Sequence, residues 1–61
     1  MDIKAMRLKL KLSQAMVAKE VGISQNHYSN IESQQRRPSP QVAKRIATVL
    51  GFSDWYRLLE Q

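Results

Sequence analysis

The chain is 61 residues long, enough for one small domain over residues 1–61. A domain of this size buries only about 60% of the surface that its unfolded chain exposes. With no cysteine and one histidine, it has neither a disulfide nor a Cys/His zinc site to stabilise it. Ten Lys and Arg against five Asp and Glu give a net charge of +5, which favours a polyanionic partner.

The apolar residues form no run near the roughly 18–20 residues that a membrane span requires. The N-terminus also lacks the apolar core of a signal peptide, so we expect a cytoplasmic protein without a membrane partner. The charge is uneven, because residues 1–50 hold nine basic and three acidic side chains, whereas residues 51–61 hold one and two. The C-terminal segment is therefore expected to lie outside the basic surface.

Five helices are predicted, over about residues 2–10, 14–21, 25–33, 40–50 and 53–60. A serine precedes each of the last four: Ser13, Ser24, Ser39 and Ser53. Each serine hydroxyl can accept a hydrogen bond from a free amide of the first turn. Gly22 and Gly51 follow the second and fourth helices, where a left-handed conformation can end a helix. No segment alternates like a strand, so we predict an all-α, compact five-helix fold.

Apolar residues at helical spacing mark the sides expected to face the core. On the first helix these are Ile3, Met6 and Leu10, and the position of Leu8 stays open. On the next three helices they are Val17, Ala18, Val21, Tyr28, Ile31, Val42, Ile46, Ala47 and Leu50.

The outer side of the third helix carries amides and hydroxyls: Gln25, Asn26, Ser29 and Asn30. An Asn or Gln side chain offers a donor and an acceptor on one fork, which matches the N6 and N7 atoms of adenine in the major groove. The alternative is an ordinary hydrated surface. However, surface helices usually use Glu, Lys and Arg, which have better helix propensity. We therefore expect these four residues to contact bases of double-stranded DNA.

The first turns of the helices that begin near residues 14, 25 and 40 contain no Asp or Glu, although a carboxylate there would stabilise each helix dipole. Bare helix N-termini are suited to phosphate, although chance also explains three short windows. Candidate phosphate contacts are the basic residues Lys9, Lys11, Arg36 and Arg37. For any single lysine, a solvated surface charge remains the alternative.

His27 and Arg7 are interpreted differently from the other cations. His27 has no clustered ligands and no nucleophile beside it in the sequence, so it is expected either on the surface or in contact with phosphate. Arg7 sits among apolar residues, and its expected partner is Glu32, the one acidic residue of the third helix. This pair would be structural and would not bind a ligand.

The last ten residues contain five large apolar or aromatic side chains: Phe52, Trp55, Tyr56, Leu58 and Leu59. Trp55, Leu58 and Leu59 share one helical face and can close the core. The alternative is a surface for self-association, which would suit both the small core and the lack of positive charge here.

Several motifs together resemble one known family. They are LSQ at residues 12–14, A-x-x-x-G-I-S at residues 18–24, Ile31-Glu32 and Pro38-Ser39. At this spacing the chain resembles the helix-turn-helix domain of the phage repressor and Cro-like group, also called the xenobiotic response element family. The likeness covers residues 3 to about 59. It implies a lambda-repressor-like fold with the helix-turn-helix at about residues 13–33, which usually binds DNA as a symmetric dimer.

The resemblance also implies roles for individual residues. Gln14 matches a glutamine that contacts phosphate and braces the first residue of the third helix. The base-reading positions match Gln25, Asn26 and Asn30, with Ser29 beside them. Arg7 and Glu32 match a buried ion pair of some members. The segment that starts at Ser53 resembles a fifth helix that helps dimerisation, which makes the expected dimer contacts Trp55, Tyr56 and Leu59.

Four positions depart from the family pattern. Lys11 and Gln34 stand where many members have glycine, so each either adopts a positive φ at a cost of about 1 kcal/mol or changes the turn. Met16 replaces a common glutamate, which removes a capping box at Ser13. Tyr28 fills a slot usually held by a smaller aliphatic residue, and its hydroxyl is expected to reach solvent or a partner.

The first functional hypothesis is a sequence-specific DNA-binding transcriptional regulator, a repressor that binds a palindromic operator as a homodimer. The alternative is a protein-interaction module on the same fold, antitoxin-like or adaptor-like, with DNA binding secondary. An enzyme is not expected, since no nucleophile, pocket or metal set can be assembled. No cofactor and no small-molecule ligand is indicated.

Overall fold

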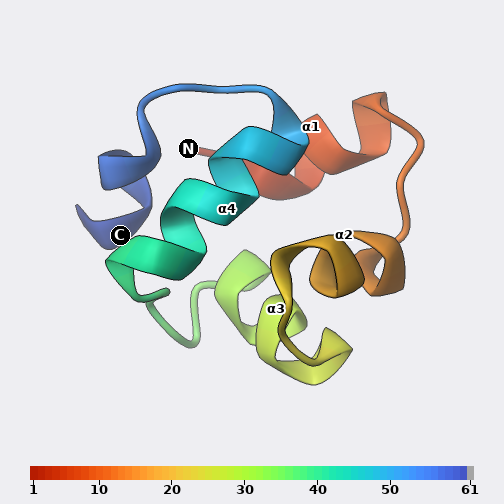
Figure 1. Ribbon diagram of the computed structural model, residues 1–61, viewed down its shortest axis with the longest axis horizontal. Coiled ribbons are helices and arrows are strands. Elements are labelled where there is room, and N and C mark those ends of the chain that lie inside the picture. Colours follow the sequence, from red (N-terminus) through yellow and green to blue (C-terminus); the bar gives the residue numbers. More distant parts are fainter. Residues whose placement is uncertain (61) are drawn as a thin grey trace.

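Four α-helices and one short 3₁₀ helix make up the computed structural model, which describes residues 1–60 (Figure 1). The elements are α1 (Ile3–Lys9), α2 (Gln14–Val21), α3 (Gln25–Glu32), α4 (Pro40–Leu50) and η1 (Trp55–Glu60). Residues 1–60 contain no strand, which confirms the predicted all-α class. None of these helices has the length and apolar character that crossing a membrane requires.

The helix boundaries follow the caps expected from the sequence. The hydroxyls of Ser13, Ser24 and Ser39 each accept a hydrogen bond from the backbone N–H three residues later, at 3.0–3.2 Å. Gly22 and Gly51 end α2 and α4 with φ of 88° and 83°, a region that costs glycine little. In both places the glycine N–H and the following N–H donate to the same helix carbonyl, which fixes the exit direction of the chain.

The C-terminal element differs from its prediction, because it is a 3₁₀ helix that begins at Trp55 and not an α-helix that begins near residue 53. The Arg57 N–H donates to the Asp54 carbonyl, and the Arg57 guanidinium pairs with the Asp54 carboxylate at 3.1 Å. Tight i to i+3 bonding is typical of short helical segments. The main neighbour of η1 is α4, which it contacts more than it contacts any other element.

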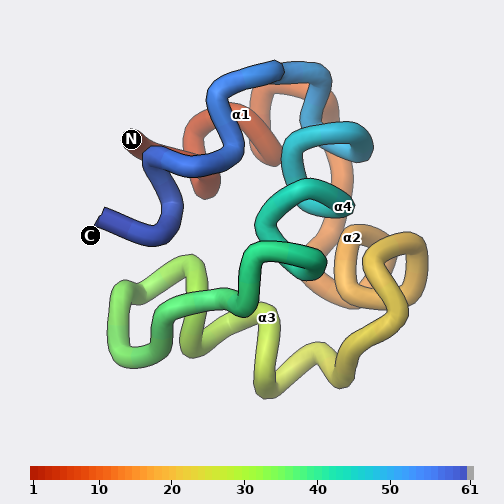
Figure 2. The backbone as a smooth tube through the Cα atoms, turned by 60° about the vertical axis from the view of Figure 1, so that its left-hand side comes forward, coloured from red at the N-terminus to blue at the C-terminus, as the bar shows by residue number. Residues whose placement is uncertain are grey.

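The core forms where α4 meets α2 and α3, and the backbone tube in Figure 2 shows α4 running through the middle of the molecule. The side chains of Val17, Val21, Tyr28 and Ile46 have no exposed surface. Ala43 is also fully buried, whereas Val42, which was expected to face inward, is only half-buried. Ile46, Ala47 and Leu50 are buried as predicted, so the buried side of α4 differs from the prediction only in its first turn.

Leu10 is the clearest error in the predicted core. It was expected on the buried side of the first helix, yet 49% of it is exposed. Because α1 ends at Lys9, Leu10 lies in the turn that follows and no longer continues the helical stripe of Ile3 and Met6. The turn closes through Lys11, whose φ is +59°, and Gln34 likewise adopts +66° after α3. Both residues therefore keep the turn geometry in which glycine is common.

Candidate nucleic-acid interface

The outer side of α3 is accessible while its inner side is buried. Gln25 and Asn26 are exposed in the first turn, and Ser29 and Asn30 are half-buried one turn later. Tyr28 and Ile31 hold the opposite side in the core. The structure thus brings two of the three amides predicted to read bases, Gln25 and Asn26, to the N-terminal end of the helix, where no acidic residue stands in the first turn.

A shallow polar trough runs along this side, built from two adjoining hollows. The first is lined by Gln14, Gln25, Asn26 and Ser29. The second is lined by Lys4, Gln14, Ser29, Glu32 and Ser33. Because both hollows include Gln14 and Ser29, they form one continuous surface from the start of α3 to α1. We call this surface the amide trough.

Lys4 is a cation of the amide trough that the sequence did not distinguish from other lysines. It lies off the apolar side of α1, as do several exposed lysines, so its position in the sequence gives no special signal. Only the packing of α1 beside α3 brings its side chain to the same surface as Ser29.

Beneath the amide trough lies the ion pair between Arg7 and Glu32. The Arg7 Nε and Nη2 atoms donate to the two Glu32 carboxylate oxygens at 2.9 and 3.0 Å, and the two side chains are only 8% and 4% exposed. Arg7 Nη1 also donates to the Leu12 carbonyl at 2.8 Å. The pair expected from the sequence is therefore present, and it ties α3 to α1 and to the turn before α2.

Gln14 joins this pair from the start of α2. Its Nε2 donates to Glu32 Oε1 at 3.3 Å, so in the free protein its amide is engaged by Glu32, although it also lines the trough beside Gln25. Burial alone would raise the pKa of the Glu32 carboxyl. The Arg7 guanidinium, with smaller contributions from the nearby Tyr28 hydroxyl and the Gln14 amide, outweighs burial and holds that pKa below its ordinary value.

Tyr28 corrects an expectation, because its hydroxyl reaches neither solvent nor a partner. The oxygen is buried and makes no hydrogen bond with any of the described residues. Burial, and then Glu32, which lies close to the hydroxyl without forming a well-aligned hydrogen bond to it, raise the pKa of the phenol well above its ordinary value. A smaller aliphatic residue at this position would avoid burying that unsatisfied oxygen, at the cost of lost packing.

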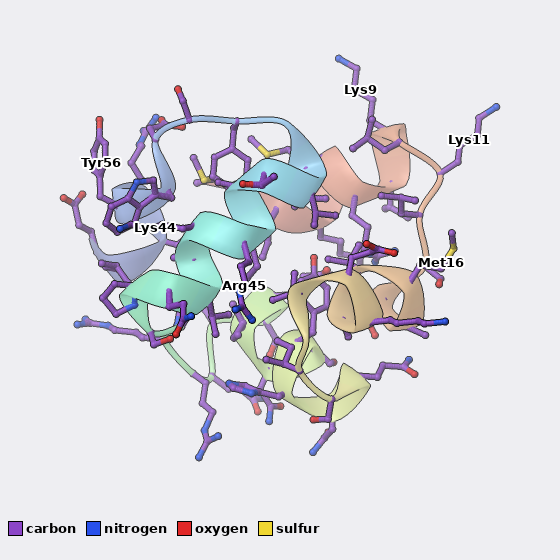
Figure 3. The ribbon with its side chains drawn as sticks, viewed as in Figure 1. Lys9, Lys11, Met16, Lys44, Arg45 and Tyr56 are labelled. Carbon is purple, nitrogen blue, oxygen red and sulfur yellow. The ribbon has the colours of Figure 1, made fainter. Side chains whose placement is uncertain are left out.

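The candidate phosphate contacts divide into two groups by position. Arg36 and Arg37 are exposed in the loop after α3, and the Arg36 N–H donates to the Asn30 carbonyl, which holds this loop against α3. By contrast, Figure 3 shows the side chains of Lys9 and Lys11 reaching outward on the α1 side, away from α3. His27 is half-buried near the start of α3.

Arg45, which the sequence did not single out, supports the turn between α2 and α3. Its Nη1 donates to the Val21 carbonyl at 3.2 Å, at the free C-terminal end of α2. The same nitrogen would lie 3.3 Å from a Cβ placed on Gly22. Arg45 is therefore a positioning residue for the angle at which α3 leaves α2. The arginine on α4 carries no sequence signal for this contact.

The residues expected in dimerisation are only partly available. Trp55 and Leu59 are half-buried, and Lys44 Nζ lies 4.9 Å from the centre of the Trp55 ring. Tyr56 packs edge-on against Trp55 and is 54% exposed. Most of the C-terminal cluster therefore closes the core over α4, and Tyr56 is its exposed part.

The sequence was compared with protein families, curated proteins and solved structures. A family model described as helix-turn-helix matches residues 3–54. An uncharacterized HTH-type transcriptional regulator of Bacillus subtilis (strain 168), YqaF, is 42% identical over 53 residues, which cover 87% of this chain and 68% of the relative. No solved structure gives a significant match.

Proposed function

This chain belongs to the Cro/C1-type helix-turn-helix family, and we propose that this DNA-binding transcriptional regulator reads sequence by placing α3 in the major groove. The observation that carries the proposal is the exposed amide side of α3, opposite a side buried by Tyr28 and Ile31. Gln25 and Asn26, at the N-terminal end, would make the first base contacts, because helices of this kind read base edges from their N-terminal residues. Ser29 and Asn30 would follow one turn later.

Phosphate contacts would then surround the base-reading residues. Gln14 stands at the first position of α2, whose free N–H groups favour an anion. In the complex its amide would turn from Glu32 towards phosphate, a movement that leaves Glu32 still paired with Arg7. Lys4 lies at one end of the amide trough, and Arg36 lies in the loop at the C-terminal end of α3.

The remaining phosphate candidates would act in two different ways. His27 and Arg37 lie close in sequence to the residues above and would touch the same backbone. Lys9 and Lys11 reach away from α3, so they would contribute to the long-range attraction of DNA more than to direct contacts.

We further propose that the regulator acts as a homodimer on a palindromic operator in the cytoplasm and represses by occupying it. One helix of eight residues reads few base pairs, and two copies would read half-sites about one helical turn apart. Tyr56 is the exposed aromatic residue of the weakly charged C-terminal segment, which makes it the expected centre of the dimer contact, with Trp55 and Leu59 beside it.

Selection of bound duplexes from a random pool tests the proposal, together with sedimentation of the selected complex to count protomers. The expected result is a two-fold symmetric site with two protomers bound. In the selected site, Gln25→Ala should relax specificity at one base position by about 1–3 kcal/mol. An equal loss of affinity on selected and random duplexes would reject the base-reading role of Gln25, and a one-protomer complex on an asymmetric site would reject the dimer.

A further inference from the structure

An apolar surface lies on a part of the molecule that the amide trough does not include. Three of the four exposed large hydrophobic residues within residues 1–60 lie between the end of α1 and the start of α2: Leu8, Leu10 and Met16. Met16 is also part of a hollow of about 540 Å³ lined by Leu12, Met16, Val17, Lys19, Glu20 and Val49. Its volume lies in the range of sites that take up ligand groups. We call it the apolar hollow.

Basic side chains surround the apolar hollow. Lys19 lines it, and Lys11 directly precedes Leu12 and reaches out on the same edge of the molecule as Met16 (Figure 3). A second hollow shares Glu20 and Val49 with the first and adds Lys44, Arg45 and Thr48. The two adjoining hollows and their rim thus carry four cations and one acidic residue, Glu20, and of the cations Lys44 lies over the Trp55 ring and Arg45 donates to the Val21 carbonyl.

The apolar hollow is also separate from the proposed DNA contacts. None of the residues that line it lines the amide trough. Apolar walls suit hydrophobic side chains and do not suit a phosphate backbone, so DNA itself is a poor occupant. A molecule bound here would leave α3 free to enter the groove.

We propose that the apolar hollow docks an acidic amphipathic helix of a partner protein. Leucine side chains at helical spacing would fill the hollow beside Met16 and Val49, and carboxylates on the flanks would face Lys11 and Lys19. A second copy of this chain fits poorly, because a two-fold contact would set the same cations against each other. The proposal does not depend on DNA binding.

A designed peptide serves as the probe, since the partner is known only by its chemistry. It is a capped 16-residue helix with leucine at positions i, i+3, i+4 and i+7 of one face and glutamate and alanine elsewhere. Two control peptides replace the leucines by serine or the glutamates by lysine. Titration of the ¹⁵N-labelled, DNA-free protein should give saturable shifts at Met16, Lys19 and Val49 with the acidic peptide, and much weaker shifts with either control.

Two variants test the apolar and the charged parts separately. Met16→Gln removes the apolar contact, and a glutamine at this position can complete a capping box with Ser13, so the fold is retained. It should weaken the peptide by about fivefold. Lys19→Glu should weaken it by at least about threefold. The matched controls are Tyr56→Gln for lost apolar surface and Arg36→Glu for the same change of charge, and both should leave peptide binding within about twofold of wild type.

Four outcomes would overturn the proposal. They are no saturable binding, equal binding of the lysine peptide, shifts centred on Gln25 and Asn26, and shifts at Val49 that follow protein concentration alone. The third would mean that the peptide only imitates DNA, and the fourth that a second copy covers the hollow. Duplex binding by Met16→Gln should stay within about twofold of wild type, so failure of the docking site and failure of the DNA-binding proposal would be told apart.

Discussion

Replacing Arg7 by methionine tests how far the ion pair beneath the amide trough holds the helix-turn-helix to α1. The change removes the two hydrogen bonds to Glu32 and the one to the Leu12 carbonyl. Glu32 keeps only the 3.3 Å hydrogen bond from Gln14 while its side chain stays almost fully buried. Removing one partner of a buried pair costs about 3–5 kcal/mol. At about 0.05–0.15 kcal/mol per residue, the whole domain has only about 3–9 kcal/mol of stability, so the variant should be close to unfolding.

The free energy of unfolding should depend on pH in opposite directions in the wild type and in Arg7→Met. In the wild type, the Glu32 pKa lies below 4.5, its ordinary value, so the unfolded chain binds the proton more tightly. The contribution of Glu32 to stability is therefore complete above pH 4.5 and is lost as the pH falls through the lower folded pKa. Without Arg7, burial, which is the largest single influence on that pKa, should raise it above the ordinary value. Lowering the pH through the raised pKa should then stabilise the variant relative to wild type.

Urea denaturation of both proteins between pH 3 and 7 measures the difference, with the same concentration of sucrose added to both so that the variant folds. The double variant Arg7→Met, Glu32→Gln is the control. It buries no charge, so it should be more stable than Arg7→Met at pH 7 and should lack the reversed pH dependence. An Arg7→Met protein within about 1 kcal/mol of wild type, with the wild-type pH dependence, would refute the role assigned to the pair.

Three further predictions follow from single positions. Tyr28→Phe removes a buried hydroxyl that has no hydrogen bond, so the free energy of unfolding should be unchanged or rise by up to about 1 kcal/mol, and a loss above that size in urea denaturation would reveal a partner for the hydroxyl. Lys11→Gly removes the strain of a non-glycine residue at positive φ, so it should raise the free energy of unfolding by about 0.5–1 kcal/mol. A decrease would mean that the left-handed lysine carries no strain. Lys4→Ala should weaken binding to all duplexes and reduce the slope of log K against log salt by about 0.9. Lys9→Ala, on the edge away from α3, is its control and should change that slope less.

Local chemistry explains why most of the helix boundaries could be predicted from the sequence. A serine cap involves an N–H three residues away, and a glycine stop involves a carbonyl four or five residues back. These groups are present wherever the segment lies in the fold. The same holds for the division of α3 into an apolar and a polar side, because helical spacing alone separates Tyr28 and Ile31 from Gln25 and Asn26.

The hydrogen bonds within a segment do not determine how the helices pack together, and the differences between prediction and structure come from this packing. Leu10 is exposed because α1 ends one residue before it, and in the first turn of α4 Ala43 is buried where Val42 was expected. Helical spacing allows either Val42 or Ala43 to face the core beside Ile46, and the packing between helices selects Ala43. The C-terminal segment forms a 3₁₀ helix for the same reason, since it must turn back over α4 within a few residues.

The sequence by itself therefore determined an all-α chain with a helix-turn-helix, an amide-bearing α3 and an arginine that needs an acidic partner. Tertiary structure decided which groups share a surface. It brought Lys4 to the amide trough, set the Gln14 amide on Glu32 and left the apolar hollow open beside Met16. The physical reason is range: caps and helical faces depend on residues within a few positions, whereas shared surfaces depend on contacts between segments far apart in the chain.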